Sequence, residues 1–174
     1  MYILALDQST RKTGWAAIDD DGIVRSWGLI KTPSKYSGLE AARYQAHEVD
    51  ALMDLIPIRT AKIVAIEDLH TGKNTSPKII YLLGALRGML VYIVGKRDLR
   101  YVICGSKDVC DFIGVSAFCK RDAKKRASKQ AAAMELWQDR SRWTEMQEDI
   151  ADAICIGKIA YQKLRLEAMM ENGV

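Results

Sequence analysis

The chain has 174 residues, of which 49% are hydrophobic and 28% are charged, and its net charge is +4 at pH 7. This length favours a single domain over residues 1–174 with a substantial core, and it excludes a kinase built from two large lobes. No uninterrupted apolar run approaches the roughly 18 residues that span a bilayer, and the N-terminus lacks the apolar region of a signal peptide. We therefore expect a cytoplasmic protein with no membrane partner.

The first third of the chain predicts three antiparallel strands and a helix. Alternating apolar runs and turn residues indicate strands at residues 2–7, about 14–19 and 23–30. Apolar residues then recur at helical spacing over residues 36–55, and Pro57 marks the end of this helix.

The remainder alternates strands and helices. We expect a strand at 62–67, a strongly apolar helix from Ser76 through Ile93, a strand at 100–104, a short helix at 106–112, a basic helix at 121–137 and a last helix from Gln147. Strand, crossover helix and strand in succession imply parallel pairing beside the antiparallel hairpins. The predicted fold class is therefore α/β, with a mixed five-stranded sheet flanked by helices on both faces.

Four acidic residues stand at positions where packing does not require them. Asp7 and Glu67 each end an apolar strand, and Asp149 and Asp152 share one face of the last helix. Taken singly, each acid is equally well explained as a turn cap or as a first-turn acid favoured by the helix dipole. Together they would repel one another unless cations neutralised them, and a pair of Mg²⁺ ions prefers such carboxylate ligands.

The opening stretch ALDQSTRKTGWA is compatible with two classes of protein. Sugar-kinase-like ATPases use such a hairpin to hold nucleotide phosphates, whereas metal-dependent nucleases use its Asp to hold a cation. The ATPase alternative requires a second phosphate-binding hairpin and a glycine-rich adenosine motif, and neither is present in the sequence. We therefore expect no nucleotide cofactor.

The cysteines and histidines do not form a zinc site. Cys104, Cys110, Cys119 and Cys155 contain no C-x-x-C pair, and the only histidines are His47 and His70. The cysteines are predicted to be packing residues in a reducing compartment.

Four motifs in order along the chain resemble the RuvC family of Holliday junction resolvases, especially its phage-type branch, within the ribonuclease-H-like nuclease superfamily. ALDQSTRKTGWA resembles the first-strand motif, VAIED the second acidic strand, LLGALRG the L-G-x-x-R-G of the dimer-side helix, and DIADA the terminal D-x-x-D-A. Each motif alone is common, but the ordered set is specific and spans essentially the whole chain.

The resemblance implies a ribonuclease-H-like fold and a function. Its four metal-binding catalytic acids map onto Asp7, Glu67, Asp149 and Asp152, with two Mg²⁺ ions per site and Mn²⁺ as a substitute. The implied activity is resolution of Holliday junctions and other branched DNA by paired symmetric nicks that leave 5′-phosphates, carried out by a homodimer in the cytoplasm of a phage-infected host. A broader branched-DNA or RNA-directed nuclease of the same superfamily remains the alternative.

The resemblance also suggests residues that contact DNA. His70 stands where bacterial members carry an aromatic residue, and Lys107 is the candidate for a lysine beside the catalytic site. The run KRDAKKRASK stands where the family presents lysines to junction phosphates, and it ends at Lys129. Arg11 and Lys12 of the first loop are additional candidates. The full set of predicted DNA contacts is His70, Lys73, Asn74, Lys107, Lys120, Arg121, Lys124, Lys125 and Arg126.

Overall fold

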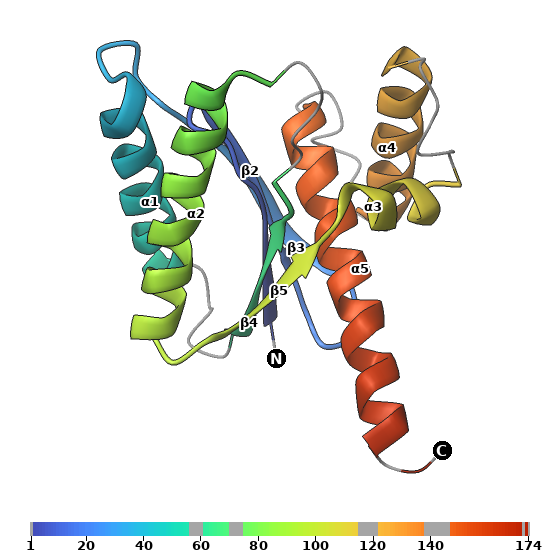
Figure 1. Ribbon diagram of the computed structural model, residues 1–174. Coiled ribbons are helices and arrows are strands. Elements are labelled where there is room, and N and C mark those ends of the chain that lie inside the picture. Colours follow the sequence, from blue (N-terminus) through green and yellow to red (C-terminus); the bar gives the residue numbers. More distant parts are fainter. Residues whose placement is uncertain are drawn as a thin grey trace.

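A mixed five-stranded sheet forms the centre of the molecule (Figure 1). In the computed structural model, the described residues are 2–55, 61–69, 75–114, 122–137, 147–171 and 173. The strands are β1 (Tyr2–Asp7), β2 (Lys12–Ile18), β3 (Val24–Lys31), β4 (Ala61–Glu67) and β5 (Arg100–Cys104), in the spatial order β3-β2-β1-β4-β5. β1 pairs antiparallel with β2 and parallel with β4, which confirms the predicted mixed sheet.

Helices cover both faces of this sheet (Figure 1). α1 (Gly38–Leu55) and α2 (Pro77–Lys96) lie on one face, and α5 (Glu148–Glu171) lies on the other with α3 (Ser106–Phe112) and α4 (Asp122–Leu136) beside it. The predicted element order is confirmed. β2 begins two residues earlier than expected, because the polar residues Lys12 and Thr13 pair with the end of β3.

The alternation of side chains along β1 divides the core into two layers. Leu4 and Leu6 pack with Val49 of α1 and with Leu86 and Leu90 of α2. The intervening residues of β1 point to the opposite face, where Ile3 and Ala5 pack against α5. Because β1 is buried on both faces, it is a continuous apolar run up to its last residue.

α5 lies unusually close to the sheet. A Cβ atom at Gly157 would stand 2.9 Å from the Cβ of Ala5, so only a glycine allows the helix backbone to reach β1 at this distance. Ile150, Ile154 and Ile159 complete the buried face of the helix. This close contact fixes the position of the first turns of α5 relative to the strand ends.

α2 combines a buried face with an apolar exposed face. Its mean hydropathy of 1.6 makes it the one helix among the described residues that could cross a membrane by length and composition alone. Leu86, Leu90 and Val94 are nevertheless buried against the sheet, while Tyr81 and Tyr92 are 65% and 70% exposed. The helix starts at Pro77, after Ser76, whose side chain accepts a hydrogen bond from the backbone N–H of Ile79.

Candidate active site

Asp7 and Glu67 meet at one edge of the sheet. β1 and β4 run parallel with Leu6 opposite Ile66, so the acidic residue that follows each of these lies at the same carboxyl edge. Their carboxyl groups are close enough to share a hydrogen bond. This arrangement follows from topology, because parallel neighbours end at the same edge.

Gly14 allows the first turn of α5 to approach this edge. Gly14 is the cross-strand partner of Asp7, and a Cβ atom at this position would overlap the backbone carbonyl of Asp149 and lie 2.9 Å from the backbone nitrogen of Ile150. A side chain on β2 would therefore push α5 away. The glycine brings Asp149 and Asp152, from the far end of the sequence, to the two strand-end acids.

The four carboxyl groups interact electrostatically. Burial raises the pKa of Asp7 well above its usual value, and the negative charges of Glu67, Asp152 and Asp149 raise it further. Burial also raises the pKa of Asp152 to about 6, although the charge of Lys129 opposes this shift. Among the described residues, no three of the four acids bring carboxylate oxygens within 4.8 Å of one another.

Lys129 of α4 contacts this acidic cluster at Asp152. Its ammonium group forms an ion pair with the carboxylate of Asp152, and the lysine is only 8% exposed. The sequence prediction had counted Lys129 with the solvent-facing basic run. The missed signal is its helical spacing from Ala133 and Trp137, which are both buried and which place Lys129 on the inner face of α4.

Two side chains hold the end of β4 by its backbone. The Nε2 of Gln8 donates a hydrogen bond to the carbonyl oxygen of Glu67 at 3.2 Å, and the Nη2 of Arg87 donates to the same oxygen. Arg87 also forms an ion pair with Asp68 at 2.9 Å, and this bond lowers the pKa of Asp68. Gln8 is 7% exposed, and its Oε1 has no hydrogen-bond partner among the described residues.

A second acidic group lies at the other end of the sheet. Asp19, Asp20 and Asp21 bring carboxylate oxygens within 4.8 Å of one another in the turn between β2 and β3. The side chain of Asp19 accepts hydrogen bonds from the backbone N–H groups of Asp21 and Ile23, and it pairs with Arg25 at 2.5 Å. Through these contacts Asp19 stabilises the turn between β2 and β3.

The sequence matches no family model and no curated protein. The fold, in contrast, matches solved structures over nearly the whole chain. Thermus thermophilus RuvC aligns with a TM-score of 0.70 at 13% identity, covering 96% of this chain and 97% of that one. The fowlpox virus Holliday junction resolvase aligns at 0.60 and 13% identity, covering 94% and 99%, and the yeast mitochondrial resolvase Ydc2 at 0.59 and 16%, covering 98% and 80%.

The chain has the RuvC-like, ribonuclease-H-like fold. The agreement is one of architecture, because the identities are low. In this RuvC-like chain the acids Asp7, Glu67, Asp149 and Asp152 all lie at the carboxyl edge of the sheet, as the sequence predicted for their positions.

Among the predicted DNA contacts, Lys107 is the one whose side chain the structure describes. Lys107 is exposed in the first turn of α3. The pKa of Asp108 is lowered mainly by its bond with Lys163, then by the Gly105 N–H and by the charge of Lys107, while burial opposes this shift. Lys124, Lys125 and Arg126 belong to α4, but their side chains lie outside the described set. His70, Lys73, Asn74, Lys120 and Arg121 also lie outside the described residues, as does Cys119. Cys104, Cys110 and Cys155 are buried free thiols, as predicted.

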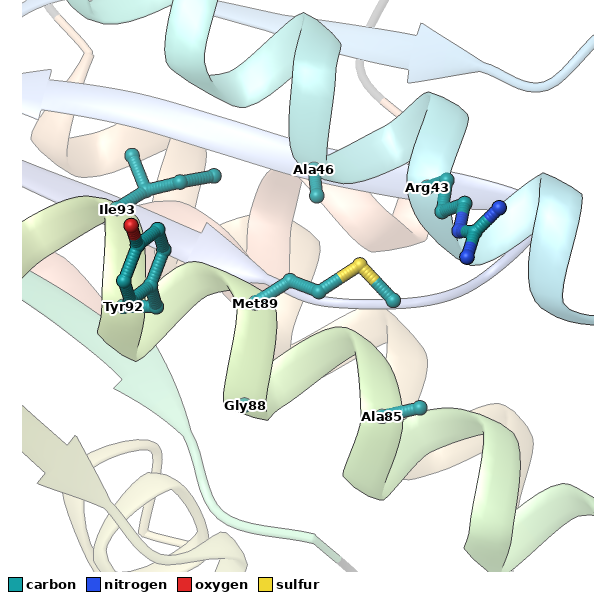
Figure 2. A pocket seen from close by; sticks show the side chains of 7 residues that line it. All are labelled: Arg43, Ala46, Ala85, Gly88, Met89, Tyr92 and Ile93. Carbon is teal, nitrogen blue, oxygen red and sulfur yellow. The ribbon is translucent and has the colours of Figure 1, made fainter.

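An apolar groove runs between α1 and α2 on the other face of the RuvC-like fold. Its volume is about 490 Å³, and Figure 2 shows Met89 of α2 extending toward α1 between Ala85 and Ala46. Gly84 and Gly88 of α2 have no other atoms near the position of a Cβ. The groove and the exposed tyrosines make α2 the apolar surface of the molecule.

Proposed function

We propose that this protein is an Mg²⁺-dependent DNA endonuclease that resolves Holliday junctions and related branched DNA by paired symmetric nicks leaving 5′-phosphates. The observation that carries the proposal is the meeting of Asp7 and Glu67 at the ends of two neighbouring parallel strands, where Gly14 allows α5 to bring Asp149 and Asp152. The whole-chain match to resolvases supports it, since Thermus thermophilus RuvC and the fowlpox virus resolvase are both solved with Holliday junction DNA.

The donor set fits divalent cations. The cluster contains four carboxyl groups and one described ammonium group, so negative charge is in excess. After burial, this excess is the next cause of the raised pKa of Asp7. Hard oxygen ligands of this kind suit Mg²⁺, with Mn²⁺ as a substitute. When bound, a metal pair supplies activation of water and stabilisation of the leaving oxygen in phosphodiester hydrolysis.

The surrounding side chains keep this site in place. Gln8 and Arg87 hold the backbone of Glu67 from two sides, which orients its side chain at the strand end. Lys129 favours the ionised form of Asp152, and only this form can bind a cation. The protein thus supplies geometry and charge balance.

A junction with two-fold symmetry needs two sites, and we propose a homodimer formed through α2. Its exposed apolar face includes Tyr81 and Tyr92, and the small residues Gly84 and Gly88 permit close approach of a second helix. We expect Tyr92→Glu to shift the sedimentation coefficient from dimer to monomer. Leu166→Glu, at a leucine that is 61% exposed on α5, is the matched control and should stay dimeric.

The decisive experiment presents three substrates to the protein: a synthetic four-way junction, a Y-fork and a linear duplex, each with Mg²⁺ or with EDTA. Paired symmetric nicks in the junction alone support the proposal. Equal cutting of all three would retain a nuclease but exclude a resolvase, and cutting in EDTA would exclude the metal site.

Site variants test the assignment of the acids. Asp7→Asn and Asp152→Asn should bind the junction but not nick it. Asp98→Asn is the matched control, because Asp98 is an exposed carboxylate at the opposite end of the sheet and asparagine tolerates its φ of 55°. Wild-type nicking by Asp7→Asn would remove Asp7 from the site.

A further inference from the structure

Four cations gather where β2 and β3 reach the edge of the sheet. Lys12 and Lys31 are direct cross-strand partners. The backbone carbonyl of Arg11 accepts a hydrogen bond from the N–H of Thr32 at 2.9 Å, and the Nη1 of Arg11 donates to the carbonyl oxygen of Tyr36 at 2.9 Å. Lys35 precedes Tyr36, so these contacts hold all four together; we call Arg11, Lys12, Lys31 and Lys35 the edge patch.

The edge patch carries charge that no carboxylate among the described residues neutralises. All four residues are exposed, and within the described residues none of them has a carboxylate oxygen within 4.0 Å. In contrast, Arg25, Arg97 and Lys163 each pair with a carboxylate. Like charges directly opposite on neighbouring strands destabilise a sheet, so Lys12 and Lys31 favour an external anion between them.

The backbone that carries the edge patch is held firmly. Tyr36 stacks on Tyr44 of α1 with ring centroids 5.3 Å apart, and the Nζ of Lys35 lies 4.9 Å from the Tyr36 ring centroid. Thr32 donates its hydroxyl to the carbonyl of Thr10 at 2.8 Å and accepts a 2.8 Å hydrogen bond from the buried Gln45. Such order reduces the entropy that a ligand must overcome on binding.

The location of the edge patch relates it to the acidic cluster. Lys12 lies two residues before Gly14, the cross-strand partner of Asp7. With strands about 4.8 Å apart and about 3.3 Å per residue, the patch backbone lies roughly 10 Å from the end of β1. On the opposite side of the cluster stands the basic helix α4 (Figure 1). The acids therefore lie between the edge patch and a helix whose sequence is rich in lysine and arginine.

The α1 side limits the patch. Glu40 and Glu48 line a surface hollow with Arg43, Tyr44 and His47, so acidic and basic side chains alternate along that helix. The part of the surface where cations stand without nearby described carboxylates is therefore the edge patch, at the same end of the sheet as Asp7.

We propose that the edge patch binds backbone phosphates of the cleaved DNA strand close to the scissile phosphate, because the patch backbone lies roughly 10 Å from the end of β1. This proposal rests on the proposed function, because the acidic cluster defines where the scissile phosphate lies. Lys31 and Lys35, which no motif of the sequence indicated, become DNA contacts. Together with α4 they direct the DNA strand across the end of the sheet, from β3 toward α5.

The test is junction binding by the full-length double variant Lys31→Ala/Lys35→Ala. Fluorescence anisotropy in Ca²⁺ measures Kd across a salt series, and phosphate-ethylation interference maps contacts relative to the nick. We expect Kd to rise at least about tenfold, the slope of log K against log salt to fall by about 1.8, and interference to disappear at phosphates close to the nick.

Matched variants keep the result interpretable. Lys96→Ala/Arg165→Ala removes the same charge from exposed positions at the far end of the sheet and should bind like wild type. Lys31→Arg/Lys35→Arg keeps the charge and should retain affinity. If the double alanine variant is folded by circular dichroism and matches the Lys96/Arg165 control in both Kd and salt slope, the proposal is overturned.

The two proposals fail in different ways. A wild-type protein that neither binds nor nicks a junction contradicts the proposed function itself. In the other case the wild-type protein binds and nicks the junction, and the double alanine variant differs from it only by self-associating in sedimentation. Lys31 and Lys35 would then only protect the outer strand β3 from pairing with another chain, and this outcome overturns the edge-patch proposal alone.

Discussion

The guanidinium group of Arg87 donates hydrogen bonds to the backbone carbonyl oxygen of Glu67 and, at 2.9 Å, to the carboxylate of Asp68. Arg87 belongs to α2, whose opposite face carries the exposed tyrosines. One side chain therefore connects the apolar surface helix to the end of β4. Any shift of α2 along the sheet would therefore displace the backbone of Glu67.

We expect Arg87→Met to lower the junction-cleavage rate by at least about tenfold and the free energy of unfolding by about 1–3 kcal/mol, because the partly buried carbonyl of Glu67 loses a charged donor. Single-turnover cleavage and urea denaturation measure the two effects. The Mg²⁺ concentration for half-maximal rate should also rise, and a role in stability alone would not change it. Asp68→Asn, which keeps the bond to Glu67, should remain close to wild type in rate.

Lys129→Met should destabilise the protein by about 3 kcal/mol, because it leaves the carboxylate of Asp152 buried without its partner. The double variant Lys129→Met/Asp152→Asn should recover much of that loss but remain inactive. Urea denaturation of the two single variants and the double variant gives the coupling energy. Strict additivity of the two single effects would contradict the ion pair.

Gly14→Ala should reduce both stability and cleavage, because its methyl group would overlap the backbone of Asp149. Overpacking of this kind costs typically about 1–3 kcal/mol. Gly95→Ala is the control: the site has open space within α2, and alanine there should stabilise by about 0.5–1 kcal/mol. Thermal melting distinguishes the two, and equal shifts would argue against the close approach of α5.

Asp7→Asn should raise the melting temperature in EDTA, because the variant removes a buried charge that is repelled by three others. Burial and these neighbours raise the pKa of Asp7, so wild-type stability falls as the pH rises above the unfolded carboxyl value of about 3.9. The gain should therefore be larger at pH 8 than at pH 5. In Mg²⁺ the order should reverse, since only the wild type gains stability from the bound ion.

The Asp108–Lys163 pair gives the opposite dependence on pH. The 2.8 Å bond from Lys163 is the largest cause that lowers the pKa of Asp108, so its stabilisation exists above the unfolded carboxyl pKa and is lost as the pH falls through the folded value. Asp108→Asn should cost about 1 kcal/mol at pH 7, because both groups are partly exposed, and nothing near pH 2. A constant difference across this range would contradict the pair.

The fold was predictable because local patterns agree with the global arrangement. β1 is a continuous apolar run, and Ser76 and Pro77 mark the start of α2. Parallel pairing of β1 with β4 followed from the crossover between them, and with it the meeting of Asp7 and Glu67. The sequence alone was therefore enough to bring the strand-end acids together.

The supports of the site were not predictable in the same way. Gln8 reaches a carbonyl 59 residues away, and Lys129 pairs with an acid in a different helix. Such contacts depend on the distance and angle between packed elements, and no local spacing encodes them. Lys31 and Lys35 lie about 20 residues after Arg11 and Lys12, and only the pairing of β2 with β3 and the bond from Arg11 to Tyr36 bring the two pairs together.

α5 is the last element of the fold to be synthesised, and it carries half of the acidic cluster. The acidic cluster draws two members from the first 67 residues and two from a helix that begins at Glu148. During synthesis, β1 and β4 leave the ribosome well before α5, so a nascent chain holds only half of its acids. The helix that completes the core also completes the cluster. A partly synthesised chain therefore lacks Asp149 and Asp152, and the acidic cluster is incomplete until α5 has packed on the sheet.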